Sequence, residues 1–145
     1  MNPVGIPSMG RMDVPNLEQI TVAVPADGAR VHVLRAVTAA AASRMRMSFD
    51  AIEDLRLAVD EASAWLLGTN PGASSLILRL LPLDDRLEAV VAVDAGDGTW
   101  PPPDVEQGLP WLILKALVDT LALGNDPSEP SISLAKRTLE PTTAP

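Results

Sequence analysis

Strand-like patterns of hydrophobic and polar positions occur in four short stretches of the chain. Residues 20–24 alternate as Ile-Thr-Val-Ala-Val, and residues 131–136 form a similar run near the C-terminus. Residues 76–83 and 87–94 are two apolar runs that meet at an Asp-Asp pair, which favours a turn between them. We therefore predict four strands, of which the middle two form a hairpin.

Two further stretches have the residue spacing of helices. Residues 29–42 are rich in Ala, which has the highest helix propensity. A second helix is expected to begin near Ser48 or Asp50, either of which can cap it, and to continue to about Leu67. Its apolar residues recur at steps of three and four positions and form one stripe: Ile52, Leu55, Val59, Ala62 and Leu66.

A third helix is predicted from Pro110 to Ala122. Proline suits the first helical turn, where its missing N–H is not needed. The segment is apolar on nearly every face except at Lys115 and Asp119, so we expect it to be buried on two sides. Helices on one face of a sheet would bury these stripes, which predicts an α/β two-layer sandwich with a mixed, mainly antiparallel sheet.

The composition and length predict one compact domain with loose ends. Pro and Gly interrupt residues 1–15, so we expect a flexible N-terminal arm there, a single domain over residues 16–138 and a flexible tail over residues 139–145. Residues 99–103, Thr-Trp-Pro-Pro-Pro, predict a stiff connector. The chain has no cysteine, no apolar run long enough to cross a bilayer and no signal pattern at its start, which predicts a cytoplasmic protein without membrane contact.

The charge distribution bears on the class of partner. A net charge of -8 argues against a surface for nucleic acid, which requires an excess of clustered Lys and Arg. Residues 29–49 nevertheless contain four arginines and no acid: Arg30, Arg35, Arg44 and Arg46. This segment is either a solvated helix face or a surface that meets an acidic protein partner.

Three motifs follow one another along the chain. They are Leu57-Ala58-Val59-Asp60-Glu61-Ala62-Ser63-Ala64-Trp65, Asp94-Ala95-Gly96-Asp97-Gly98 and Gly108-Leu109-Pro110-Trp111. Taken alone, each has an ordinary structural explanation. A helical glutamate is usually a solvated charge, a tryptophan usually packs in a core or interface, and Asp-Gly runs usually form turns.

In this order and spacing the motifs resemble those of the anti-sigma factor serine kinases. That family belongs to the histidine kinase/Hsp90-like (GHKL, Bergerat-fold) ATPases, and the resemblance extends from about Leu17 to Lys136. It implies that Glu61 is a general base, which accepts the proton of a target serine hydroxyl during phosphoryl transfer. It also implies that the Asp94 carboxylate accepts a hydrogen bond from the adenine amine.

The resemblance implies a binding role for four further positions. Gly96 and Gly98 would let the backbone approach the adenine base, and Gly108 would open the helix whose N-terminus attracts phosphate. Ser131 or Ser133 would stand in for the threonine hydroxyl that the family places near adenine, and Ser131 is the candidate taken forward.

The sequence departs from the family pattern at the metal and phosphate positions. Trp65 stands where the family has an asparagine that ligates magnesium, and an indole offers no oxygen ligand. Pro110 replaces the second glycine of a Gly-x-Gly pair and has no N–H for a phosphate. The segment between Asp94 and Gly108 is short for a lid that closes over ATP.

The resemblance implies a regulator of transcription. Such a protein binds and inhibits an alternative sigma factor, is countered by an anti-anti-sigma protein and pairs as a homodimer. ATP or ADP is the implied cofactor, with the magnesium position lost, so that kinase activity is reduced or absent. Two alternatives remain open. One is an active Mg-ATP-dependent serine kinase in which Asp60 replaces the lost asparagine, and the other is a nucleotide-free dimerisation module in which Trp65 and Trp111 are core residues.

Overall fold

The fold is an antiparallel sheet covered on one face by helices. The computed structural model describes residues 18–94 and 100–138, so the predicted arm over residues 1–15 and the tail over residues 139–145 lie outside the described residues. The elements are β1 (Ile20–Pro25), α1 (Val31–Ser43), α2 (Phe49–Thr69), β2 (Ser75–Pro82), β3 (Arg86–Val93), α3 (Leu109–Leu117), β4 (Thr120–Leu123) and β5 (Ser131–Arg137), with short 3-10 turns at Gly28–Arg30 and Val105–Gln107.

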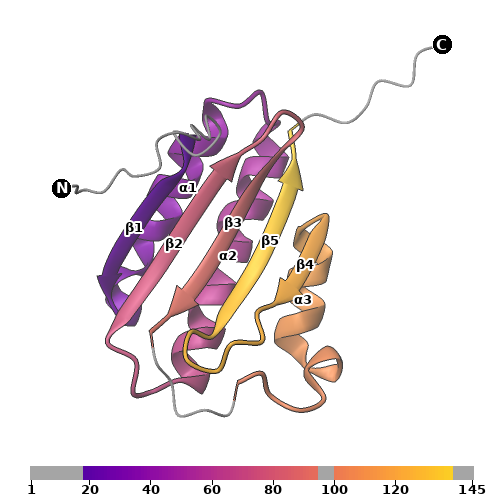
Figure 1. The fold of residues 1–145 in the computed structure, drawn as a ribbon. Coiled ribbons are helices and arrows are strands. Elements are labelled where there is room, and N and C mark those ends of the chain that lie inside the picture. The colour runs from indigo at the N-terminus through magenta and orange to yellow at the C-terminus, as the bar shows by residue number, and fades with distance from the viewer. Residues whose placement is uncertain (1–17, 95–99, 139–145) are drawn as a thin grey trace, which may run out of the picture.

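The sheet has the strand order β1-β2-β3-β5-β4, and every described pairing of strands is antiparallel (Figure 1). The register aligns one row of inward-facing apolar residues across all five strands: Val22, Leu78, Val91, Ile132 and Leu123. Period-2 alternation along each strand places these side chains towards the helices. The predicted α/β two-layer sandwich with a mainly antiparallel sheet is confirmed.

Helix α2 is the central element of the helical layer and lies between α1 and α3 (Figure 1). Its N-cap is Ser48, whose hydroxyl oxygen accepts a hydrogen bond from the N–H of Ala51 at 3.0 Å. Leu55, Val59 and Leu66 from the predicted stripe are fully buried. The helix ends at Thr69, two residues beyond the predicted end.

The prediction for the third helix is wrong in length and in burial. Helix α3 ends at Leu117, and the next residues turn into the edge strand β4 instead of continuing to Ala122. The N–H of Asp119 donates to the carbonyl of Ala135 on β5 at 2.8 Å, so pairing with the sheet replaces helical hydrogen bonds. Leu114 is the one fully buried residue of α3, whereas Leu109 and Leu112 are 68% and 53% exposed.

Lys136 on β5 joins the sheet to the helical layer. Its ammonium group donates to a carboxylate oxygen of Asp54 on α2 at 3.1 Å and to the carbonyl of Leu117, the last residue of α3, at 2.9 Å. A cation at this place satisfies a helix carbonyl that has no partner within the helix. None of the helices within the described ranges is both long and apolar enough to span a membrane.

Candidate functional site

Three of the predicted site residues, Asp94, Gly108 and Ser131, lie at one end of the sheet, which is the lower end in Figure 1. There β3 stops, β5 and α3 start, and α2 ends. Asp94 directly follows β3, Ser131 opens β5 opposite Ala92, and Gly108 is the N-cap of α3. Glu61 lies on α2, partly buried, four residues before Trp65. Gly96 and Gly98 lie outside the described residues.

The Asp94 carboxylate holds the loop between α2 and β2. One of its oxygens accepts the backbone N–H groups of Ser74 at 2.7 Å and Ser75 at 3.1 Å, and the other accepts the Ser74 hydroxyl. These hydrogen bonds, that of the Ser74 hydroxyl first, lower the pKa of Asp94. Since a carboxylate oxygen has two lone pairs, the first oxygen is fully occupied, and the second keeps one lone pair beside the Ser74 hydroxyl.

Trp65 packs against Trp100 instead of facing an open metal position. The two ring centroids are 5.7 Å apart and the ring planes are inclined by 67°, which is an edge-to-face arrangement. Trp100 is 4% exposed, and its indole N–H donates to the carbonyl of Gly124 at 2.9 Å. The predicted packing role of Trp65 is thereby explained, and its partner comes from the segment that was predicted as a stiff connector.

The start of α3 offers few backbone donors for a phosphate. The N–H of Gly108 donates to the carbonyl of Val105 at 3.1 Å, and Pro110 in the first turn has no N–H. A β-carbon at Gly108 would meet neighbouring atoms at ordinary contact distances of 3.5 Å or more, so glycine is not required here for a close backbone approach. The phosphate role that the resemblance implies for Gly108 gains no support from this geometry.

Ser131 approaches the backbone of Gly124. A β-carbon added at Gly124 would lie 2.1 Å from the Ser131 hydroxyl oxygen, and the N–H of Gly124 donates to the carbonyl of Ser131 at 2.9 Å. The connection from β4 to β5 is therefore held close to the start of β5. The indole N–H of Trp100 donates to the carbonyl of the same glycine, so Gly124 connects Ser131 to the tryptophan pair.

The described part of this site offers few groups that could hold magnesium or a phosphate. Asp60, which could replace the lost asparagine, lies 3.8 Å from the guanidinium of Arg35 on α1. Within residues 18–94 and 100–138 no group of three or more His, Cys, Asp or Glu side chains is placed to hold a metal ion. At the positions that the resemblance assigns to metal and phosphate, the chain has Trp65 and Pro110.

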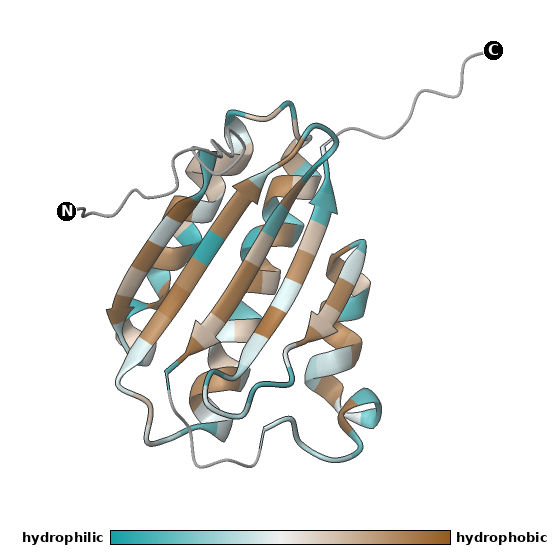
Figure 2. Ribbon diagram, in the orientation of Figure 1, coloured by the Kyte–Doolittle hydropathy of each residue, from teal (hydrophilic) through white to brown (hydrophobic). Residues whose placement is uncertain are grey.

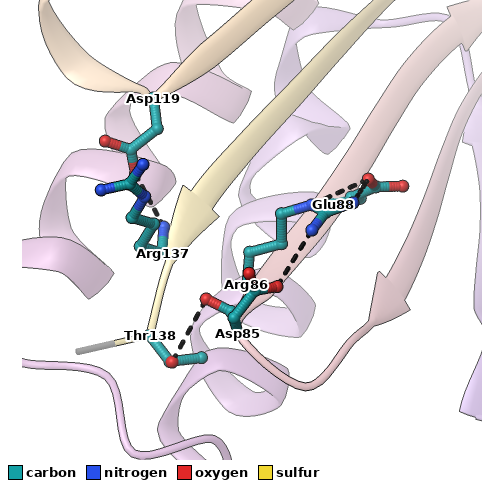
Figure 3. Close-up of polar contacts among 6 residues, drawn as sticks. All are labelled: Asp85, Arg86, Glu88, Asp119, Arg137 and Thr138. Atoms are coloured by element: carbon teal, nitrogen blue, oxygen red, sulfur yellow. Dashed lines mark hydrogen bonds and ion pairs between the residues drawn. The ribbon is translucent and has the colours of Figure 1, made fainter. Parts of the chain in front are cut away.

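A second polar cluster lies at the opposite end of the sheet and belongs to no predicted site. Figure 3 shows Arg86 between Asp85 and Glu88, at 2.9 Å and 3.1 Å, and Asp119 beside the backbone N–H of Arg137 at 2.7 Å. These residues line a depression of about 310 Å³. Its charges are of both signs. The Arg86 guanidinium is paired with the carboxylates of Asp85 and Glu88, so the cluster offers no dedicated site for an anion or a cation.

Sequence reasoning missed three residues of the candidate site: Ser74, Trp100 and Gly124. Trp100 carries a signal that could have found it, because a large aromatic residue in an otherwise proline-rich stretch is expected to be buried. Ser74 and Gly124 carry no such signal. Their roles depend on partners that the fold brings together from 20 and 24 positions away.

Comparison with known proteins gives two similar sequences. No protein-family model matches the chain. The serine-protein kinase RsbW of Bacillus subtilis strain 168 is 38% identical over 88 residues, covering 57% of this chain and 52% of the relative. The serine-protein kinase RsbW of Bacillus velezensis is 33% identical over 85 residues, with the same shares covered. The chain thus spans about half the length of the curated relatives it matches.

A solved structure shares the fold. The crystal structure of the RsbU and RsbW domains of Rv1364c from Mycobacterium tuberculosis superposes with a TM-score of 0.65 over 85% of this chain and 33% of that chain. The sequence identity is 15%, so this likeness concerns the arrangement of strands and helices alone.

Proposed function

The chain is related to the anti-sigma factor serine kinases, and from this relation we propose that it binds an alternative sigma factor and blocks that factor's access to RNA polymerase. An anti-anti-sigma protein is its antagonist, the active form is a homodimer, and phosphoryl transfer is reduced or lost. One observation carries the proposal: the fold of an RsbW domain is kept, while the tryptophan at the metal position is packed against Trp100.

The loss of kinase activity follows from what phosphoryl transfer needs. Magnesium and backbone donors stabilise the charge on the transferred group, and little else in the protein takes part in the chemistry. Here Trp65 offers no oxygen to a metal, and Pro110 offers no N–H to a phosphate. Glu61 could still accept a proton, but a base without these two supports gives slow transfer at most.

The arginine-rich segment around α1 supports a protein-binding role. Arg35 forms an ion pair with Asp60 of α2, whereas Arg30, Arg44 and Arg46 are exposed to solvent. On a chain of net charge -8, this is a local basic surface that suits an acidic patch on a partner. Arg44 and Arg46 stand together at the turn between α1 and α2.

The second candidate function is an active serine kinase that phosphorylates its antagonist. It is favoured by the placement of Glu61 on α2, partly buried and one helical turn before Trp65. For Asp60 to ligate magnesium, its side chain would have to leave Arg35. Incubation of the chain with radiolabelled ATP, Mg²⁺ and the captured antagonist tests this candidate, and transfer of label that Glu61→Ala abolishes would establish it.

The test of the anti-sigma function is capture of partners from the lysate of the native organism on the immobilised chain, with and without Mg-ATP, followed by mass spectrometry. A sigma factor retained under both conditions is the expected result. Retention that requires Mg-ATP would support the kinase candidate, and absence of any sigma factor under both conditions would contradict the proposal. A chain that binds neither a sigma factor nor ATP would be a nucleotide-free dimerisation module.

Three variants sharpen the capture experiment. Glu61→Ala is expected to retain the sigma factor as the wild type does, because the proposal gives this residue no part in binding. The double variant Arg44→Glu with Arg46→Glu is expected to retain less, because it reverses charge on the basic surface. Arg137→Glu at the end of β5 is the matched control, exposed and of the same charge, and is expected to have no effect.

A further inference from the structure

We infer that Trp100 occupies the space between α2, the end of β3 and the start of β5 where the resemblance places the nucleotide, so that the chain's own indole replaces the ligand. This inference rests on the proposed function, since it explains how an RsbW-like fold binds a partner without ATP. It does not depend on which partner is bound. We call Trp65, Trp100 and Gly124 the aromatic clasp.

The burial of Trp100 is the first observation. The residue follows the Asp94–Gly98 motif and precedes three prolines, in a connection where side chains usually face solvent. It is nevertheless 4% exposed and belongs to the same hydrophobic core as Leu55, Leu66 and Ile132. Trp100 lies in the loop just after the Asp94–Gly98 motif, and its buried ring fills space that an open nucleotide site would need.

The contacts of the ring are the second observation. The Trp100 ring packs edge-to-face against the ring of Trp65, with the two centroids 5.7 Å apart. Trp65 lies on α2, four residues after Glu61. The indole N–H reaches the carbonyl of Gly124, whose own N–H is bound to Ser131 at the start of β5. A flat aromatic ring with an N–H donor is also what adenine presents to a protein. The indole therefore fills apolar space and satisfies a backbone carbonyl with the same kinds of group that a purine carries.

The hydrogen bonds from Ser74 and Ser75 to the Asp94 carboxylate, which we call the Asp94 latch, are the third observation. The carboxylate that the resemblance assigns to adenine is held by Ser74, just before β2, and by Ser75, the first residue of β2. The carboxylate thus accepts three hydrogen bonds within the chain, and the ring space is filled by Trp100. The expected consequence is a site that is ordered and stable without any nucleotide, and that a nucleotide cannot enter while Trp100 is in place.

The test is ligand rescue of a cavity variant, read as the thermal midpoint Tm. Trp100→Gly removes the ring, and free indole should raise the Tm of this variant. If the ring stands in for a base, adenosine and ADP should also raise its Tm by about 4 °C, which is the shift expected at roughly tenfold excess over Kd in a domain of this size. The wild type should show no rise with adenosine or ADP.

A matched control and a second variant keep the test decisive. Trp111→Gly removes the partly buried tryptophan of α3 outside the clasp, and adenosine should not raise its Tm. If Trp100→Gly fails to fold, Trp65→Ala opens the same space from its partly buried side, and adenosine should raise the Tm of that variant.

Two outcomes would overturn the inference. Rescue by indole without any rise from adenosine or ADP, in Trp100→Gly or in its substitute Trp65→Ala, would show that the ring is an ordinary core residue. A rise in the wild type would show that a nucleotide site is open beside Trp100. Neither result bears on sigma-factor capture, so failure of this inference is distinguishable from failure of the proposed function.

Discussion

At the end of the sheet where β3 stops, side chains and backbone groups far apart in sequence are joined, whereas around the β2–β3 turn at the other end the ion pairs join close neighbours. Trp100 reaches Trp65 on α2 and the carbonyl of Gly124 before β5. At the opposite end, Arg86 pairs with residues one and two positions away. Figure 2 shows hydrophilic residues at the β2–β3 turn and hydrophobic ones along the middle of the strands.

The two ends thus differ in the kind of side-chain contact, although the charged end also has longer-range hydrogen bonds, from the Arg137 N–H to Asp119 and from the Thr138 hydroxyl to the Asp85 carbonyl. Long-range contacts fix the relative positions of α2, β3 and β5 at the candidate site, which is the end that a bound nucleotide would otherwise order. The charged end at the turn is exposed and its ion pairs are of the kind that contribute little to stability. Mutations at the two ends should therefore differ greatly in their effect on stability.

The largest expected effect belongs to Trp100→Ala. Removing a buried tryptophan leaves a cavity and an unpaired carbonyl at Gly124, so the free energy of unfolding should fall by about 3–5 kcal/mol. Urea denaturation followed by far-UV circular dichroism measures this change. Trp111→Ala, at a partly buried position on α3, is the control and should cost less than half as much. Equal costs would contradict the special role of the clasp.

The next largest effect is expected at Asp94. Asp94→Asn weakens three hydrogen bonds and should lower the free energy of unfolding by about 1–2 kcal/mol at pH 7. Ser74→Ala removes just the hydroxyl donor and should cost less. The comparison of the two variants by denaturation at pH 7 separates the carboxylate from the loop it holds.

The same residue predicts a pH dependence. Folding lowers the pKa of Asp94, so its contribution to stability is present above the unfolded value near 3.8 and is lost as the pH falls through the folded value. Wild-type Tm should therefore fall with pH below about 4 more steeply than the Tm of Asp94→Asn. Parallel curves for the two proteins would show that the latch does not form in solution.

Much of the fold was predictable because its elements carry local signals. Alternation predicted β1 and β5, the Asp84-Asp85 pair predicted the hairpin, and the Ser48 cap predicted the start of α2. Each predicted boundary agrees with the structure within two residues. β4 was missed because Thr120–Leu123 continues the apolar composition of α3. Four residues are too few to distinguish a period of two from one of 3.6, and pairing with β5 decided the outcome.

The sequence singled out some residues of the candidate site, but it did not predict how they are arranged. The motifs identified Asp94 and the unusual Trp65, yet the Asp94–Ser74 latch and the Trp65–Trp100 pair arise from tertiary contacts. A single sequence has no signal that links positions 20 or 35 residues apart. The predicted roles of Gly96 and Gly98 stay predictions, since these residues lie outside the described ranges.

A smaller loss of stability than for Asp94→Asn is expected at Lys136, which connects the sheet to the helical layer. Lys136→Met keeps the aliphatic stem but removes the donors to Asp54 and to the Leu117 carbonyl, and should lower the free energy of unfolding by about 1 kcal/mol. Because the ion pair is partly exposed, the cost should shrink further in high salt. Denaturation at low and high ionic strength measures both quantities.

The smallest effect is expected at Arg86, at the charged end. Its guanidinium pairs with Asp85 and Glu88, but the side chain is 40% exposed, so solvent screens both pairs. Arg86→Ala should change the free energy of unfolding by less than about 0.5 kcal/mol. Denaturation under the same conditions as for Trp100→Ala gives the ratio of the two costs. A cost above that of Asp94→Asn would reverse the comparison and would place the structural centre of the sheet at the β2–β3 turn.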